Sequence, residues 1–231
     1  MDNYFEAGIE DLRQKLLVMA SRAETAVNES VRALMQRDHA LALRVKADDD
    51  VIDRLEVEID DMAIQLLTKA PLASNLRLVT VAMKISQNLE RIGDEATKIA
   101  KRAHELSQEP PVKVHLDLTH MATLALNMVK NALDAFVHRD SAAARSLIPR
   151  DKEVDELNKH IHEQAVQHMM ANPETIGRCL HWIVAAKSLE RIADHAKNIA
   201  EEVVYLCEAQ DIRHAHWGKK PEDGRDATAM N

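Results

Sequence analysis

Apolar residues recur at helical spacing through most of the chain. Between residues 83 and 106 they fall at Met83, Ile85, Leu89, Ile92, Ala96, Ile99, Ala103 and Leu106. Steps of two to four residues place such a series on one face of an α-helix. A counterpart follows as Ile183, Leu189, Ile192, Ala196, Ile199 and Val203. Strand-forming residues do not cluster, and only 3% of residues are aromatic. The pattern predicts an all-α protein.

The chain also repeats itself. The run Leu-Glu-Arg-Ile-Gly-Asp at 89–94 returns as Leu-Glu-Arg-Ile-Ala-Asp at 189–194, which is 100 positions later. Nearer the start of each copy the offset is 102, as in Arg37-Asp38 and Arg139-Asp140. Offsets shared over this length indicate duplication of a unit of about a hundred residues.

Each copy is predicted to contain three helices. The expected boundaries are about 7–36, 39–69 and 75–106 in the first copy, and up to 138, 141–171 and 173–209 in the second. Asp38 and Asp140 are the expected N-caps of the second helices, while Pro71 and Ser74 mark a turn and Pro110-Pro111 breaks the chain. Short connections favour antiparallel neighbours. We therefore expect two tandem three-helix bundles, six long antiparallel helices, over residues 1–109 and 112–210, followed by a disordered tail at 211–231.

The formal net charge of −8 narrows the choice of partners. It disfavours nucleic acid and anionic lipid, both of which need a basic surface, and it suits the binding of cations.

No apolar run approaches the length of a membrane span, and the two cysteines, Cys179 and Cys207, have no metal-binding or disulfide spacing. The N-terminal residues do not resemble a signal peptide. The expectation is a cytoplasmic protein that reaches the inner membrane only through partners, without direct insertion.

Acidic residues repeat with the helices. They form four pairs spaced i, i+4: Asp49 and Asp53, Glu90 and Asp94, Asp151 and Asp155, and Glu190 and Asp194. Such pairs share one helix face. Counted from Pro71, Asp53 lies 18 residues before the turn and Glu90 lies 19 after it, and the second copy has a similar register about Pro173. Antiparallel helices would therefore bring four carboxylates to one level in each copy. Carboxylate oxygens suit Mg²⁺ or Mn²⁺ and also bind iron or zinc.

Other interpretations of these acids stay open at this point. The acids could form a solvated face paired with Arg54, Arg91 and Arg191, on a helical scaffold without functional metal. His195 and Asn198 are further candidate ligands of the second cluster. A metal-dependent hydrolase is disfavoured because no general base or nucleophile stands out beside the acids. A di-iron enzyme is disfavoured because Glu-x-x-His does not occur. The expectation is a protein that is not an enzyme.

The duplicated run resembles the PhoU family. The fuller pattern that we associate with this family, Glu-Arg-Ile-x-Asp-His-Ala-x-Asn-Ile, is complete at 190–199. The first copy has Glu95 in place of the histidine and Lys98 in place of the asparagine. This departure puts the metal affinity of the first copy in doubt, and Lys98 could replace a cation there. If only one copy binds metal tightly, the sequence favours the second.

The resemblance implies a function that the residues alone do not show. Members of this family are accessory regulators of the bacterial phosphate-specific transport system, are cytoplasmic and often homodimeric, and are not enzymes. They are thought to link the ATPase subunit of the transporter to a membrane sensor histidine kinase. Their role is negative regulation of phosphate uptake and of phosphate-starvation signalling. By resemblance, Glu90/Asp94 and Glu190/Asp194 would bind metal.

Overall fold

The computed structural model describes residues 2–68, 72–114 and 116–213, with side chains described from Phe5 onward. Within these ranges the chain forms helices and no strand, which confirms the all-α prediction. The elements are α1 (Asp2–Gln36), α2 (His39–Leu67), α3 (Ala73–Ser107), α4 (Leu118–His138), α5 (Ser141–Leu147), the 3₁₀ turn η1 (Ile148–Arg150), α6 (Asp151–Ala171), the 3₁₀ turn η2 (Pro173–Thr175) and α7 (Ile176–Glu208). The bounds agree closely with the periodicity of the sequence.

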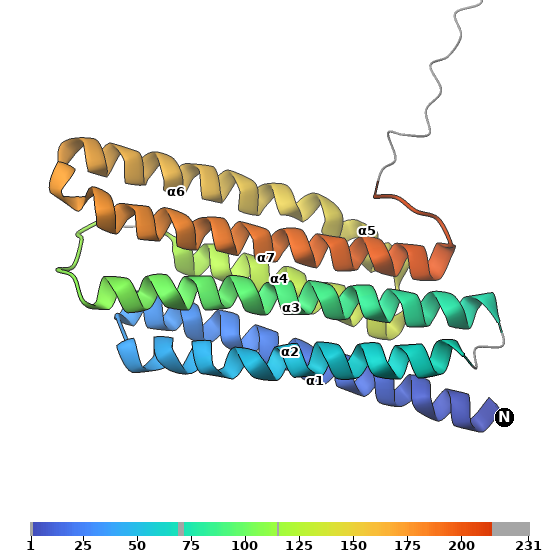
Figure 1. Ribbon diagram of the computed structural model, residues 1–231. Coiled ribbons are helices and arrows are strands. Elements are labelled where there is room, and N and C mark those ends of the chain that lie inside the picture. The colour runs from blue at the N-terminus through green and yellow to red at the C-terminus, as the bar shows by residue number, and fades with distance from the viewer. Residues whose placement is uncertain (1, 69–71, 115, 214–231) are drawn as a thin grey trace, which may run out of the picture.

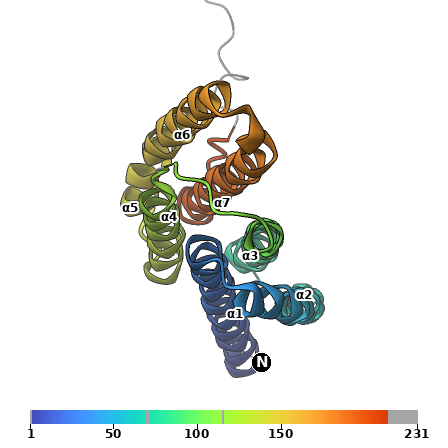
Figure 2. The same ribbon diagram turned by 90° about the vertical axis from the view of Figure 1, so that its left-hand side faces the viewer.

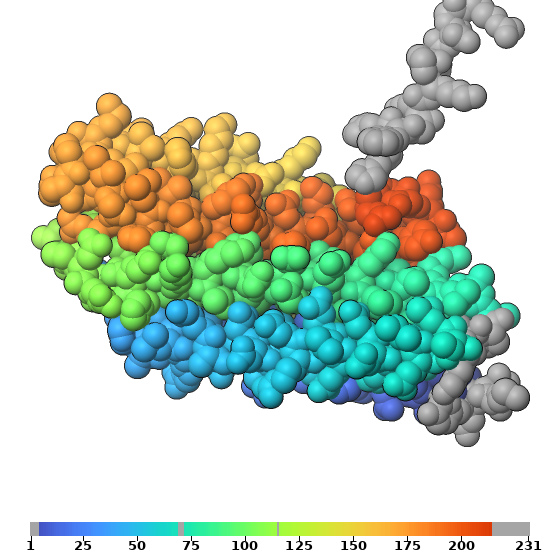
Figure 3. All heavy atoms as spheres, in the orientation of Figure 1, coloured from blue at the N-terminus to red at the C-terminus, as the bar shows by residue number. Residues whose placement is uncertain are grey.

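The helices form two units in tandem, as predicted. Helices α1 to α3 make the first unit and α4 to α7 the second, and the units join through contacts of α3 with α7 and of α1 with α4. Figure 1 shows α6, α7, α3 and α2 lying side by side in that order, and the end view in Figure 2 places α1 and α4 behind them. The space-filling view in Figure 3 shows that these four helices make up one face of the molecule. The acids of both units belong to these four helices.

The duplicated Arg-Asp dipeptide reverses the chain in both units. Arg37 and Arg139 adopt left-handed backbone angles, with φ of 58° and 51°, which end the preceding helices. Asp38 then accepts a hydrogen bond from Leu41 N at 2.9 Å and starts α2. Asp140 accepts one from Ala143 N at 2.9 Å and starts α5. Both predicted caps are confirmed, because capping depends only on residues next to each other in sequence.

The second unit departs from the expected continuous helix between residues 141 and 171. Pro149 sits in η1, and the chain there divides into α5 and α6. Proline lacks the N–H that a helix interior requires and clashes with the preceding turn. The last helix likewise begins with a 3₁₀ turn at Pro173, and Ser74 lies inside α3 instead of in the turn before it. Pro71 and the tail from residue 214 onward lie outside the described residues.

The predicted apolar series form the core. All residues of the two stripes are buried except Met83 and Ile183, which pack against the core while partly exposed. Helices α2 and α3 approach each other closely at Gly93. A Cβ at Gly93 would lie 2.9 Å from Ile52 Cδ1 and 3.4 Å from Asp49 Oδ1. The missing side chain therefore lets the two acid-bearing helices of the first unit come together.

Charged residues hold the two units to each other. Helices α3 and α7 run antiparallel, and Glu95 of α3, only 4% exposed, accepts hydrogen bonds from Lys98 at 2.9 Å and from Arg191 of α7 at 3.3 Å. Further along, Glu202 of α7, also 4% exposed, is paired with Lys84 of α3 at 3.0 Å. Buried carboxylates need such partners, since an unpaired charge in the interior is costly.

No helix in the described part of the chain has the length and apolarity needed to span a membrane.

Candidate metal centres

The first cluster forms between α2 and α3. Asp49 and Asp53 come from α2, and Glu90 and Asp94 from α3. Their charges act on one another: Asp53 and Asp94 both raise the pKa of Asp49, and Asp94 and Asp53 both raise that of Glu90. The antiparallel register predicted from the sequence therefore brings the four acids of the first unit close enough for their charges to interact.

The surroundings of the first cluster are mostly acidic. Burial is the main reason that the pKa values of Asp49 and Glu90 are raised, followed by their acidic neighbours. Glu56 of α2 is a fifth acid, whose own pKa is raised by burial, by Asp60 and by Asp53. Compensation comes from Arg91, whose Nε lies 3.4 Å from Glu90 Oε2 and whose Nη1 lies 3.7 Å from Asp94 Oδ2. The side chain of Arg91 is more than half exposed, so this pairing is screened by solvent.

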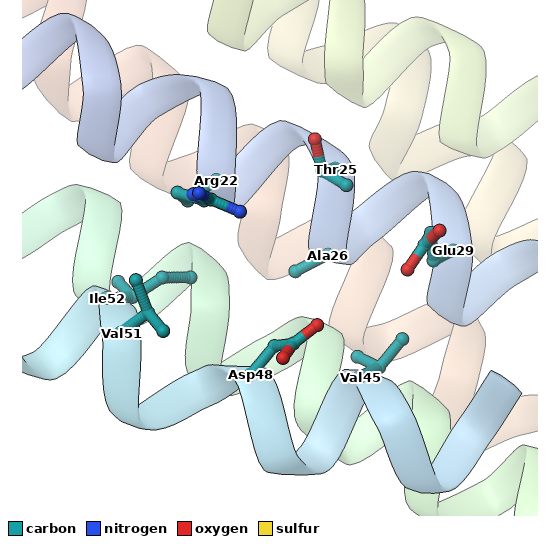
Figure 4. A pocket seen from close by; sticks show the side chains of 8 residues that line it. All are labelled: Arg22, Thr25, Ala26, Glu29, Val45, Asp48, Val51 and Ile52. Carbon is teal, nitrogen blue, oxygen red and sulfur yellow. The ribbon is translucent and has the colours of Figure 1, made fainter.

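Neighbouring members of the acidic run at residues 48–50 face different helices. Asp48 lines a small crevice between α1 and α2, together with Arg22, Thr25 and Glu29 of α1 (Figure 4). Asp49 is one residue further on, where the turn of the helix directs it toward Gly93 of α3. A helix rotates by about 100° per residue, which separates the directions of neighbouring side chains.

The second cluster forms at the equivalent place between α6 and α7. Asp151 and Asp155 come from α6, and Glu190 and Asp194 from α7. Burial, Asp151 and Glu190 raise the pKa of Asp155, and the same three influences raise that of Asp194. Asp151 is 5% exposed, and its Oδ1 has no hydrogen-bond partner. The predicted acids of the second unit are therefore also brought together.

Basic and amide groups enter the second cluster directly. Lys197 Nζ lies 2.8 Å from Asp151 Oδ2. Lys187 forms an ion pair with Glu190, and Asn158 Nδ2 donates to Glu190 Oε2 at 3.3 Å. Asp151 lies in the first turn of α6, where the helix dipole favours a carboxylate. The protein itself thus neutralises much of the charge of this cluster.

The donor set of both clusters suits a hard metal ion. Four carboxylates can supply the oxygen ligands that Mg²⁺ or Mn²⁺ prefers, and the unpartnered, buried Oδ1 of Asp151 is a donor without a hydrogen bond. Among the described residues, no three His, Cys, Asp or Glu side chains are arranged so that they could hold an ion as they stand. Like charges repel when no cation lies between them. Binding would therefore require the side chains to turn inward.

The first cluster gains no cation from Lys98, contrary to the possibility raised by the sequence. Lys98 pairs with Glu95 at 2.9 Å, and Glu95 faces Arg191 of the other unit. Burial acts to raise the pKa of Glu95, but hydrogen bonds, led by that from Lys98, hold it below its ordinary value. Both residues that replace the family pattern in the first copy thus belong to the contact between the units.

The candidate ligands His195 and Asn198 also face the contact between the units. His195 Nδ1 lies 3.0 Å from Asn88 Oδ1, and Asn198 Nδ2 lies 3.4 Å from the same oxygen. Burial lowers the pKa of His195, and none of the charged groups that act on it, which are Glu95, Arg91, Lys98 and Arg191, is an acid of the second cluster. The suggestion that these two residues complete the second cluster is therefore wrong for the arrangement seen here.

Sequence reasoning missed four residues that shape the clusters. They are Glu56 in the first unit and Asn158, Lys187 and Lys197 in the second. The repeat offsets held the signal, because residue 56 aligns with 158, Gln87 with Lys187, and Thr97 with Lys197. Comparing the copies at positions where they differ would have found them.

Comparison with known proteins agrees with the duplicated architecture. A family model described as PhoU domain matches residues 16–103 and again 118–203. The phosphate-specific transport system accessory protein PhoU homolog of Pseudomonas aeruginosa is 42% identical over 212 residues, covering 91% of this chain and 88% of that protein. The corresponding protein PhoU of Escherichia coli is 34% identical over 211 residues, covering 91% and 88%.

Solved structures show the same fold. The crystal structure of PhoU from Pseudomonas aeruginosa matches with a TM-score of 0.84 and 42% identity, over 89% of this chain and 100% of that one. The phosphate transport system regulatory protein PhoU from Streptococcus pneumoniae matches with a TM-score of 0.84 and 26% identity, over 90% and 99%. The two matched segments of the family model fall within the two units of the structure. This chain belongs to the PhoU family.

Proposed function

We propose that this chain is a negative regulator of phosphate uptake and of phosphate-starvation signalling. The relatives are named as accessory proteins of a phosphate-specific transport system, and their likeness extends over nearly the whole chain. The chain would act as an adaptor between the ATPase subunit of the transporter and a membrane sensor histidine kinase, as a homodimer at the cytoplasmic side of the inner membrane. It would have no catalytic activity of its own.

We further propose that the carboxylate clusters bind metal ions. The supporting observation is that, in each copy of the unit, four acids on the second and third helices lie close enough for their charges to raise one another's pKa values. A duplicated arrangement of repelling charges is costly unless something compensates it. Mg²⁺, Mn²⁺, Zn²⁺ or iron bound there would join α2 to α3 and α6 to α7. The bound ions would stiffen the face on which these four helices lie.

The regulatory role can be tested in cells that lack the endogenous protein. Expression of the wild-type chain should restore low phosphate uptake and low activity of a phosphate-starvation reporter in high phosphate. Pulldown from the same cells should recover the transporter ATPase or the sensor kinase. Failure to restore repression would overturn the regulatory role, and association with neither partner would overturn the adaptor role.

The metal role has a separate test. Elemental analysis of protein purified without chelator should find metal. The content should fall when Glu90 and Asp94, or Glu190 and Asp194, become alanine. The matched control is Glu6→Ala/Glu10→Ala, which removes an exposed acid pair of the same spacing from α1. Equal metal content in all three double variants would contradict metal binding by the clusters.

A further inference from the structure

We propose that the two clusters differ in metal affinity because the second carries its own cations, so that the first unit binds a divalent ion more tightly. This inference rests on the proposed metal role of the clusters. It concerns the residues that differ between the copies: Glu56, Gln87 and Thr97 in the first unit, against Asn158, Lys187 and Lys197 in the second. It reverses the preference for the second unit drawn from the family pattern.

The first difference lies beside the acid pair of the third helix in each unit. In the second unit, Asn158 donates to Glu190 at 3.3 Å and Lys187 forms an ion pair with it. At the matching places of the first unit, Glu56 repels Glu90 and raises its pKa, and Gln87 lies in the same groove as Glu56 without a charge. Glu190 is therefore neutralised by the protein, whereas Glu90 lies beside an additional acid.

The second difference lies deeper, at Thr97 and Lys197. Thr97 lies beside Asp49 with a neutral hydroxyl. Lys197, one repeat later, places its ammonium group 2.8 Å from Asp151 Oδ2. An ammonium group at this position occupies one oxygen of a carboxylate that a metal would use. The other oxygen, Oδ1, is buried and unpartnered, so the second cluster retains one free donor on Asp151.

The charge balance follows from these contacts. Around the first cluster are five acids (Asp49, Asp53, Glu56, Glu90 and Asp94) and one arginine, Arg91, whose side chain is 55% exposed. Around the second cluster are four acids (Asp151, Asp155, Glu190 and Asp194) and two lysines in direct contact with them. A divalent ion entering the second cluster must work against both lysines and displace Lys197. An ion entering the first cluster meets a stronger negative potential, and in the described part of the chain its four acids form ion pairs with Arg91 and with no lysine.

The test uses the full chain, stripped of metal with chelator and titrated with MnCl₂ in a calorimeter. The wild type should show two classes of site. Lys197→Thr, which installs the residue of the first unit, should tighten the weaker site by about tenfold or more, because a unit positive charge a few ångströms from a divalent ion repels it even in water. Thr97→Lys should weaken the tighter site by a similar factor. Lys197→Gln provides a second variant if threonine weakens α7.

The control is Lys130→Thr, which makes the same change at an exposed position of α4 away from both clusters. Its two affinities should equal those of the wild type. Loss of the tighter site in Glu90→Ala/Asp94→Ala, but not in Glu190→Ala/Asp194→Ala, would assign it to the first unit. Two equal sites, an unchanged weaker site in both Lys197 variants, or a tighter site in the second unit would overturn the inference and leave the metal role intact. No binding of Mn²⁺ by any variant would overturn the metal role itself.

Discussion

The carboxylate clusters of the two units have the same four acidic positions and opposite surroundings. Between α2 and α3, burial and an additional acid, Glu56, raise the pKa of Glu90. Between α6 and α7, Lys187 and Lys197 make ion pairs with the acids. A repeated motif therefore does not imply a repeated site. Under the proposed metal role, the acids would fix where a cation binds, and the residues around them would decide how tightly it is held.

Truncation of the apolar side chains packed beneath the clusters should have the largest effect on the free energy of unfolding. Ile52, 2% exposed, lies under the first cluster against Gly93. Ile52→Ala should lower the free energy of unfolding by about 2–5 kcal/mol and weaken Mn²⁺ binding between α2 and α3. The repeat counterpart Val154→Ala removes one carbon fewer and should cost less, by about 0.8 kcal/mol for that carbon. Urea denaturation measures both, and a larger loss for Val154→Ala would contradict the close packing at Gly93.

The stabilisation of the protein by added metal should be the second largest effect, and it should distinguish the two clusters. A ligand at 100 times its dissociation constant stabilises the folded state by about 2.7 kcal/mol. Mn²⁺ at about 100 times the dissociation constant of the tighter site should therefore raise the melting temperature of wild-type protein mainly through the first unit. Glu90→Ala/Asp94→Ala should lose most of this rise, and Glu190→Ala/Asp194→Ala should keep most of it. The control Glu6→Ala/Glu10→Ala should behave as wild type, and an equal loss in the two cluster variants would refute the difference.

The pH dependence of metal-free protein gives a smaller effect. Asp49, Glu56 and Glu90 have raised pKa values, so the folded state binds protons more tightly than the unfolded state. Stability should thus rise as the pH falls from 7 toward these raised values and be lost again as the pH rises through them. Glu95 acts the other way, because its pKa is lowered, but it loses stability only below its ordinary value of 4.5. His195 also acts the other way, because burial lowers its pKa, and it removes stability as the pH falls through the ordinary histidine value of 6.5.

The gain that these acids contribute between pH 7 and pH 5 should stay below about 1 kcal/mol, since like-charge pairs on helices cost a few tenths each. Substituting Asn for Asp49 and Gln for Glu56 and Glu90 should flatten the curve. Asp155→Asn/Asp194→Asn should flatten it less, because Lys197 and Lys187 already oppose the raised pKa of Asp155. Chemical denaturation with EDTA present at each pH makes the measurement. If the curve of the substituted protein has the same shape as the wild-type curve, the acids are not strained in the folded state.

Replacement of Glu56 by its counterpart in the second unit should have the smallest effect on stability. Glu56→Asn installs the residue of the second unit and should stabilise metal-free protein by about 0.2–0.5 kcal/mol, by removing repulsion from Asp53 and Asp60. Asn158→Glu should cost a similar amount in the second unit. Glu24→Asn, at an exposed position of α1, controls for the loss of one negative charge. Thermal unfolding in EDTA should rank the variants in this order, and destabilisation by Glu56→Asn would argue against repulsion.

The sequence predicts the features that depend on local chemistry and on register. The helix caps at Asp38 and Asp140 depend on residues next to them in sequence. The height of the acids along each pair of antiparallel helices can be predicted by counting residues on both sides of the turn. Features that depend on which helices meet were harder to predict. His195 follows Asp194 directly, and a rotation of about 100° per residue turns it away from the acids and toward Asn88 of α3. Lys98 pairs with Glu95 locally, three residues away on α3, whereas the pairing of Glu95 with Arg191 and of Asp151 with Lys197 depends on which helices meet.

The break between α5 and α6 and the lysines of the second cluster have signals in the sequence that the periodicity and the repeat do not reveal. Pro149 interrupts an otherwise regular periodicity, and the apolar spacing across it concealed the break between α5 and α6. The lysines of the second cluster stand at positions where the copies differ. A search for identical residues in a repeat cannot find them, whereas the differences at Thr97 and Lys197 carry the information on charge.

Anomalous diffraction from crystals of the wild-type chain, grown with about one equivalent of Mn²⁺, tests the central claim most directly. If the neighbours of the acids set the affinity, the anomalous signal will lie between α2 and α3, among Asp49, Asp53, Glu90 and Asp94, and will exceed any signal between α6 and α7. Equal signals in the two units, or a stronger one beside Lys197, would contradict the account.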